Sequence, residues 1–122
     1  MATGDDLCER LTTFAVRTIK LSDGLPRSLA GRHIAKQVLR SGTAAGANSE
    51  EARGAESRAD FVHKLGIAIK ELKETRYWLA VAGQAKLVNN KRLGPLLEEC
   101  EELCAIAGRS IITAKKNRDS SM

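Results

Sequence analysis

The spacing of apolar residues between Phe61 and Ala82 constrains the fold of this chain more than any other feature. Along this line the residues are separated alternately by four and three positions: Phe61, Leu65, Ala68, Leu72, Thr75, Leu79 and Ala82. This period matches one face of an α-helix that packs against its neighbours at about 20° in a left-handed arrangement. A half-buried strand would show alternation at every second position, which is absent. The spacing therefore predicts a long helix over 57–83, and Ser57-x-x-Asp60 supplies its capping box.

A helical period recurs in three other segments. One helix is expected over 4–22, after a Thr3-x-x-Asp6 capping box, and another over 27–53, after the turn at Leu25-Pro26. The inner stripe of the 4–22 helix is Leu7, Leu11, Phe14, Thr18 and Leu21. The inner stripe of the 27–53 helix becomes small and polar midway: Ile34, Val38, Ser41, Ala45, Asn48 and Ala52. Gly42 and Gly46 lie beside this stripe, and they offer a flat face on which another backbone can approach closely.

The last helix is expected over 95–116, because Gly94-Pro95 resembles an N-cap followed by a first-turn proline. Its inner stripe is read as Leu97, Cys100, Cys104, Ala107, Ile111 and Ala114. Four helices joined by short turns predict an all-α fold, an antiparallel up-down-up-down four-helix bundle with left-handed packing. The chain is expected to form one domain, 1–122, with a polar tail over 117–122.

Two simple features limit the class of protein. The longest uninterrupted apolar stretch is six residues, 77–82, far short of the ~20 that a membrane-spanning helix needs. No membrane partner is therefore expected, and the acidic start does not resemble a signal peptide, so a cytoplasmic location is expected.

The three cysteines, Cys8, Cys100 and Cys104, form no disulfide framework or zinc pattern and are read as reduced, small, buried hydrophobes.

The net charge of +5 is unevenly distributed. Between residues 10 and 40 there are seven basic residues and a single acid, Asp23. Arg32, Lys36 and Arg40 step by four along the expected second helix, and the neighbouring helix carries Arg10, Arg17 and Lys20. Such a stripe can neutralise a phosphate backbone, so these six residues are the candidate RNA- or DNA-binding residues. The alternative is a solvated surface that keeps the protein soluble.

Polar residues also project where the second and third helices are expected to meet: Ser41, Asn48, Glu51, Glu71 and Glu74. Facing carboxylates can bind metals, but di-iron bundles need Glu-x-x-His on two helices, and the nearest match here is a single Asp60-x-x-His63. These residues are instead read as a structural polar layer that includes an Arg40 or Arg53 ion pair. The sequence has no nucleophile motif and no phosphate-cradling loop, so no catalytic residue, cofactor or metal is expected.

The segment 37–78 resembles the bacterial four-helix bundle family named after proteins encoded in intervening sequences of large-subunit ribosomal RNA genes. The features that carry the resemblance are Arg40-Ser41, Gly46-x-Asn48, Glu51-Ala52-x-Gly54, Ser57-x-x-Asp60-Phe61, Ile67-Ala68 and Glu71-x-x-Glu74, with Leu25-Pro26 at the first turn. The resemblance implies a small bundle that assembles with itself, typically into a ring-like pentamer, and that has no established enzymatic activity. Relatives in fold serve diversity-generating retroelements as basic accessory proteins that bind nucleic acid and a reverse transcriptase.

A second apolar face on the third helix fits such an assembly. Ile67, Tyr77, Trp78 and Val81 fall outside the inner stripe of that helix, which indicates either a broader core face or a partner. With the family resemblance, they are read as the oligomer interface. The sequence as a whole thus predicts a non-catalytic homo-oligomer that binds RNA or DNA through a basic surface. The alternatives are a protein scaffold or accessory subunit and, as a minor one, a carboxylate-metal enzyme.

Overall fold

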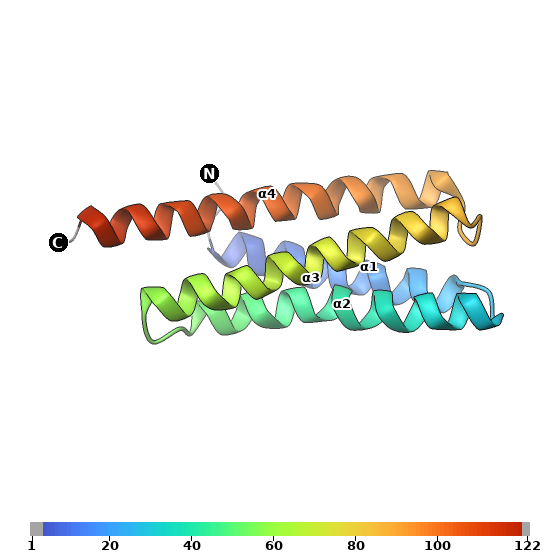
Figure 1. Cartoon of the computed structure of the whole chain (residues 1–122), viewed down its shortest axis with the longest axis horizontal. Helices are drawn as coiled ribbons and strands as arrows, with labels where there is room; N and C mark the ends of the chain where they lie inside the picture. The colour runs from blue at the N-terminus through green and yellow to red at the C-terminus, as the bar shows by residue number, and fades with distance from the viewer. Residues whose placement is uncertain (1–3, 121–122) are drawn as a thin grey trace.

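The computed structural model describes the backbone of residues 4–120 and the side chains of residues 6–117, and within this range the fold is all-α. Four helices follow one another: α1 (Gly4–Gly24), α2 (Leu29–Arg53), α3 (Arg58–Gln84) and α4 (Asn90–Ser120). Figure 1 shows them packed lengthwise into one bundle. The predicted four-helix, all-α fold is confirmed.

The chain reverses direction at each connection (Figure 1). Between α1 and α4, for example, Arg10 contacts Glu99 whereas Lys20 contacts Arg92, so residue numbers rise on one helix as they fall on the other. Consecutive helices pack most closely, and the α1–α4 seam that closes the bundle is the least tightly packed of the four. Both the α1–α2 and the α3–α4 connections lie at the same end of the molecule.

The core follows the predicted inner stripes of the first three helices. Leu11, Phe14 and Thr18 of α1, and Leu72 and Leu79 of α3, are completely buried. Two stripe members, Phe61 and Asn48, are only half-buried. The helical period of 3.6 residues accounts for this agreement, because the positions that share one face of a helix must also share one environment.

The small stripe of α2 lets α1 approach closely. Helix α2 runs without a break through Gly42 and Gly46. A Cβ at position 42 would lie 2.6 Å from the Thr18 hydroxyl oxygen, so a side chain larger than hydrogen does not fit there without movement of α1. The predicted close approach of another backbone at this face is confirmed, since the Leu11 carbonyl oxygen would lie 3.5 Å from a Cβ at position 46.

The prediction that the fourth helix starts at residue 95 is wrong, because α4 begins five residues earlier. The Asn89 side-chain oxygen accepts a hydrogen bond from the Lys91 amide at 2.7 Å, which caps the helix at this point. Pro95 therefore lies inside α4, where it removes one backbone donor. Burial of Leu93 and Leu96 in the core outweighs this loss.

The predicted inner stripe of the fourth helix needs the same correction. Cys100 and Ala107 are buried as expected, but Leu97, Cys104, Ile111 and Ala114 are only half-buried. The face that points into the core instead carries Leu93, Leu96, Cys100, Leu103, Ile106 and Ala107. Helix α4 also continues to Ser120, so most of the expected polar tail is helical.

The other helix ends depend on serine caps. The Ser57 side chain accepts a hydrogen bond from the Asp60 amide at 3.1 Å, as the capping box predicted. Helix α2 begins at Leu29 and not at residue 27, because the Ser28 side chain caps it through the Gly31 amide. The expected cap of the first helix, Thr3, lies outside the described residues.

None of the helices that the structure describes is long and apolar enough to span a membrane.

Candidate functional site

Two of the six candidate nucleic-acid-binding residues are held in ion pairs within the chain. The Arg10 guanidinium lies 2.6 Å from a Glu99 carboxylate oxygen and 3.2 Å from one of Glu102. Arg40 of α2 contacts Glu71 of α3 at 2.9 Å and also pairs with Glu74. Because these carboxylates neutralise their charge, Arg10 and Arg40 add little to an anion-binding surface.

The ion pairs also act on the arginines themselves. The hydrogen bond from Arg10 to Glu99 raises the pKa of Arg10 above its usual value, and the hydrogen bond to Glu71 does the same for the pKa of Arg40. A raised pKa means that the charged form is favoured by its partners. Both arginines therefore fasten one helix to the next, α1 to α4 and α2 to α3.

The other four candidates have no such partner. Among the described residues, no carboxylate lies within ion-pairing distance of Arg17, Lys20, Arg32 or Lys36. Lys20, Arg32 and Lys36 are exposed and Arg17 is half-buried. They occupy the last turns of α1 and the first turns of α2, at the end of the bundle that holds the α1–α2 and α3–α4 connections. We call this region the basic end.

The fold adds two further cations to the basic end from α4. Lys91 and Arg92 line a hollow of about 310 Å³ together with Arg17 and Lys20 of α1. Its remaining lining is Leu21, Pro95 and Leu96, so no acidic side chain faces it. Lys91 and Arg92 are absent from the predicted set because the predicted helix starts at residue 95, which leaves them in a connection. The run Leu93, Leu96, Cys100, Leu103 and Ala107, with its spacing of three and four, is a signal in the sequence that places the helix start at or before Leu93.

Arg92 is fixed in place at this hollow. Its guanidinium donates a hydrogen bond to the Lys20 carbonyl at 3.0 Å, across the α1–α4 seam. It also lies over Gly24, where an added Cβ would come within 2.8 Å of one guanidinium nitrogen. The absence of a side chain at Gly24 thus allows Arg92 to pack against the end of α1.

A second feature of this end is an aromatic group between α2 and α3. The rings of His33 and Trp78 meet edge to face at 5.5 Å, and those of Trp78 and Tyr77 at 5.0 Å. Tyr77 is 60% exposed, whereas the Trp78 indole nitrogen is buried without a hydrogen-bond partner. His33 also lines a shallow hollow with Leu29, Arg32 and Lys36.

The four residues read as an oligomer interface differ in exposure. Tyr77 is exposed, Ile67 is half-buried, and Trp78 and Val81 are half-buried and pack against the hydrophobic core. Trp78 and Val81 therefore widen the core face of α3 within one chain. Tyr77 is the member of this group whose ring stays available to a partner.

The five residues of the expected polar layer do not form one layer. Glu71 and Glu74 pair with Arg40 as predicted, but Asn48 donates to a carbonyl of its own helix and Glu51 pairs with Lys64 at 3.2 Å. The reason is helix geometry, since residues seven positions apart on α2 are about 10 Å apart along its axis.

Ser41, the remaining member of the expected layer, forms a buried polar contact deep in the bundle. The Thr75 hydroxyl oxygen lies 2.7 Å from Ser41 Oγ and 2.8 Å from the Glu71 carbonyl, and Ser41 donates to the Gln37 carbonyl. Both hydroxyls are completely buried. This contact joins α2 to α3 beneath the Arg40 ion pairs.

The cysteines occupy the interior as expected, with one exception. Cys8 and Cys100 are buried, and the Cys100 thiol lies 3.1 Å from the Leu72 carbonyl. Cys104 is half-buried. The adjacent Cys100 thiol lowers the pKa of Cys104 to about 7, against the opposing effect of burial, and the nearby charges of Arg76 and Lys73 add to the lowering.

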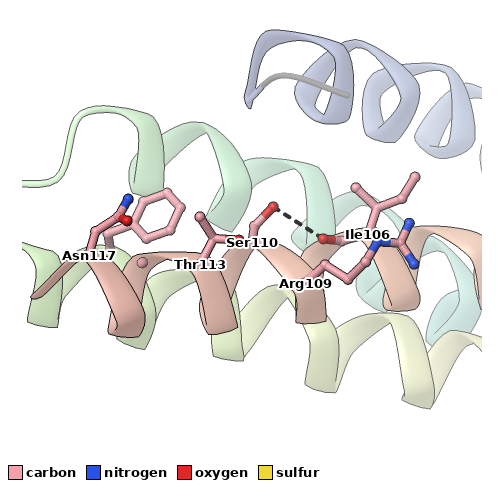
Figure 2. Close-up of a pocket in the computed structure, with 7 residues that line it drawn as sticks. Ile106, Arg109, Ser110, Thr113 and Asn117 are labelled. Carbon is pink, nitrogen blue, oxygen red and sulfur yellow. Dashed lines mark hydrogen bonds between the residues drawn. The ribbon is translucent and has the colours of Figure 1, made fainter. Parts of the chain in front are cut away.

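A wider hollow lies at the opposite end, between α3 and the final turns of α4. It measures about 600 Å³ and is lined by Phe61, Ile106, Arg109, Ser110, Thr113, Ala114 and Asn117. Figure 2 shows the labelled α4 side chains, where Ser110 donates a hydrogen bond to the Ile106 carbonyl. The lining contains no carboxylate, histidine or thiol, so the Ser110 and Thr113 hydroxyls have no general base among these residues to activate them. Among the side chains that the structure describes, residues 6–117, no three His, Cys, Asp or Glu groups are placed so that they could hold a metal ion.

Comparison with known proteins places the chain in a family. The model of the family described as 23S rRNA-intervening sequence protein matches residues 6–109. The chain belongs to this family. The resemblance identified from the sequence is thereby confirmed, and the match spans all four helices while ending before the last turns of α4.

A solved structure shows the same fold. It is the crystal structure of a protein of unknown function of the S23 ribosomal protein family from Bacteroides thetaiotaomicron. The two chains superpose with a TM-score of 0.78 at 34% sequence identity, over 86% of this chain and 97% of that protein. Among curated proteins, none matches this member of the intervening sequence family.

Proposed function

We propose that this protein is a non-catalytic bundle that binds RNA or DNA through the phosphates, using its basic end. The observation that carries the proposal is the contrast between two kinds of cation. Arg10 and Arg40 are neutralised by carboxylates of the same chain, whereas no carboxylate of the described residues lies within ion-pairing distance of Arg17, Lys20, Arg32 or Lys36. Cations kept unpaired at one end of a protein attract a polyanion.

The arrangement favours contact with the backbone over reading of bases. Lysine and arginine neutralise phosphates and release condensed counterions, which gives affinity without sequence preference. Base stacking needs several exposed aromatic rings, and among the described Phe, Tyr and Trp residues Tyr77 is the one that is exposed. The name of the family refers to an intervening sequence of 23S rRNA and states no ligand, so the charge distribution is what supports the proposal.

The proposal is tested by measuring RNA binding as a function of salt. We expect fluorescence anisotropy with a short structured RNA to give an affinity that falls steeply between low and physiological salt. Reversing Arg32→Glu and Lys36→Glu together is expected to weaken binding about 100-fold or more at physiological salt. The matched control is Lys70→Glu with Lys73→Glu on the outer face of α3, which makes the same change of charge elsewhere. Equal losses in the two double variants, or no RNA binding by the wild-type protein, would leave a protein scaffold as the better account.

We also propose that the protein assembles with copies of itself, with Tyr77 at the contact. An aromatic ring that is 60% exposed and braced edge-on by Trp78 is a typical anchor of a protein interface. The family resemblance suggests a pentamer. Light scattering should give a multiple of the 13.2 kDa chain mass, and Tyr77→Ser should lower that mass. Ile112→Ser, which alters an exposed apolar residue at the other end of the molecule, is the control. A monomeric wild type, or an assembly unchanged by Tyr77→Ser, contradicts this proposal.

A further inference from the structure

The hollow between α1 and α4 gathers four cations around a small volume. Arg17 and Lys20 come from the last turns of α1, and Lys91 and Arg92 from the first turn of α4. Buried Leu21 and Leu96 also line it, and no acidic side chain does. Like charges gathered around one hollow repel one another, because with a Debye length of about 8 Å at physiological ionic strength, neighbouring charges are only partly screened by salt. The chain therefore bears an electrostatic cost at this point that a bound anion would remove.

The site is also partly ordered in advance. The Arg92 guanidinium is fixed by the Lys20 carbonyl at 3.0 Å and by its packing over Gly24. A guanidinium carries five N–H donors, and one of them has a partner among the described groups of this site. An arginine whose position is fixed and whose donors remain available suits the oxygens of a phosphate group.

The position of the hollow gives an anion a structural role as well. It lies on the α1–α4 seam, which is the least tightly packed seam of the bundle. Near this end, the Arg92 to Lys20 hydrogen bond joins the two helices directly. An anion held by cations from both helices would add a second connection at this end of the seam.

We propose that the hollow of Arg17, Lys20, Lys91 and Arg92 is a phosphate-binding site that clamps one phosphodiester group of the nucleic acid between α1 and α4. The inference rests on the proposed nucleic-acid binding and goes beyond it by naming the anchoring phosphate site, which includes two residues outside the basic stripe of the sequence. It also couples ligand binding to the stability of the bundle, because the anion binds the folded arrangement of α1 and α4 and not the unfolded chain.

The test uses Arg17→Gln with Lys91→Gln in the full chain. Neither side chain has an ion-pair partner among the described residues, so this variant is expected to fold and, at low salt, to melt at or above the wild-type temperature. Thermal melting is followed with and without low-millimolar pyrophosphate at matched ionic strength. The wild type should gain about 5 °C at a concentration ten times the dissociation constant. Lys70→Gln with Lys73→Gln, which removes the same charge from α3, should keep this gain, whereas Arg17→Gln with Lys91→Gln should lose it.

A second measurement separates this inference from the proposed function. For RNA binding, Arg17→Gln with Lys91→Gln should reduce the slope of log affinity against log salt by about 2. If RNA binds with an unchanged slope in this variant, the clamp is overturned while the proposed function survives. If pyrophosphate stabilises the wild type and the α3 control but not the hollow variant, and RNA does not bind, the phosphate site stands and the proposed function fails. An equal pyrophosphate gain in all three proteins overturns the site.

Discussion

Two neighbouring regions of this bundle differ in how their basic residues are paired. At the α2–α3 seam, Arg40 is held by Glu71 and Glu74, and the buried Ser41 and Thr75 hydroxyls contact each other beneath it. At the basic end, Lys36 lies one turn and Arg32 two turns earlier on the same helix, and neither meets a carboxylate among the described residues. In the first region the arginine is paired with carboxylates of the same chain. In the second region the cations face solvent without an ion-pair partner among the described residues.

The difference shows that spacing along a helix does not assign a role to a cation. The three basic residues repeat every four positions, so they share one face of α2. What separates them is the neighbouring helix, which presents two carboxylates to Arg40 and an aromatic group near Arg32 and Lys36. Paired cations contribute to stability, whereas the proposed binding depends on the unpaired cations, whose mutual repulsion lowers stability.

The largest expected effect comes from reversing the charge of the paired arginine. Arg40→Glu removes two ion pairs and places a third carboxylate beside Glu71 and Glu74, which should lower the free energy of unfolding by about 2 kcal/mol in urea titrations. Arg32→Glu on the same face should change it by less than about 0.5 kcal/mol. Equal losses for the two variants would break the distinction between the two regions.

The next effect concerns the hydroxyl contact below Arg40. Thr75→Val keeps the shape of the side chain but removes the hydroxyl that lies 2.7 Å from Ser41 and 2.8 Å from the Glu71 carbonyl. We expect a loss of about 1.5 kcal/mol in the free energy of unfolding, because the Ser41 oxygen remains buried with one partner fewer. Thr13→Val, at an exposed position of α1, serves as the control and should be close to neutral. A stable Thr75→Val protein would show that this contact is not needed.

A smaller effect of the opposite sign is expected at the basic end. Lys86 lies just after the end of α3 and has a φ of 60°. The Lys86 amide donates a hydrogen bond to the Gly83 carbonyl and the Leu87 amide donates one to the Ala82 carbonyl, which together form a Schellman motif. Lys86→Gly should raise the free energy of unfolding by about 1 kcal/mol, since glycine adopts this conformation without a Cβ clash. Lys86→Ala removes the same charge but keeps the Cβ, so it should give no such gain. A gain in both variants would assign the effect to charge.

The smallest stability effect belongs to Cys104, whose thiolate is favoured by the adjacent Cys100 thiol and then by Arg76 and Lys73. Its folded pKa of about 7 lies below that of a free thiol, about 8.5. The Cys104 contribution to stability is present above about pH 8.5 and is lost as the pH falls through 7, whereas the pKa of Cys100, which Cys104 and burial raise, takes stability away above about pH 8.5. Alkylation of Cys104, followed by mass spectrometry, should rise with a midpoint near pH 7. Cys100→Ala should move that midpoint upward; an unchanged midpoint would remove Cys100 as the cause.

The features predicted correctly from the sequence are those that depend on a single helix face or a few neighbouring residues. The stripes of α1, α2 and α3, the serine cap at Ser57 and the close approach at Gly42 all follow from local periodicity and steric size. The start of α4 was missed because Gly94-Pro95 is a strong local signal for a helix start. Burial of Leu93 and Leu96 overrode it, and burial depends on the rest of the bundle.

The candidate site was harder to predict from the sequence, because it too depends on how distant parts of the chain pack together. Six basic residues were identified from charge and spacing, but their division into paired and unpaired groups depends on carboxylates up to 92 positions away, as between Arg10 and Glu102. Lys91 and Arg92 lie beside Arg17 and Lys20 because α4 packs against α1, and this packing is a property of the tertiary structure.

The sequence by itself determined that this chain is a four-helix bundle of the intervening sequence family, because helical periodicity and caps act over a few neighbouring residues. Only the tertiary structure decided which charges are neutralised and which face solvent together. Electrostatic partners are set by distance in space, and in this bundle that distance is fixed by how the four helices lie against one another.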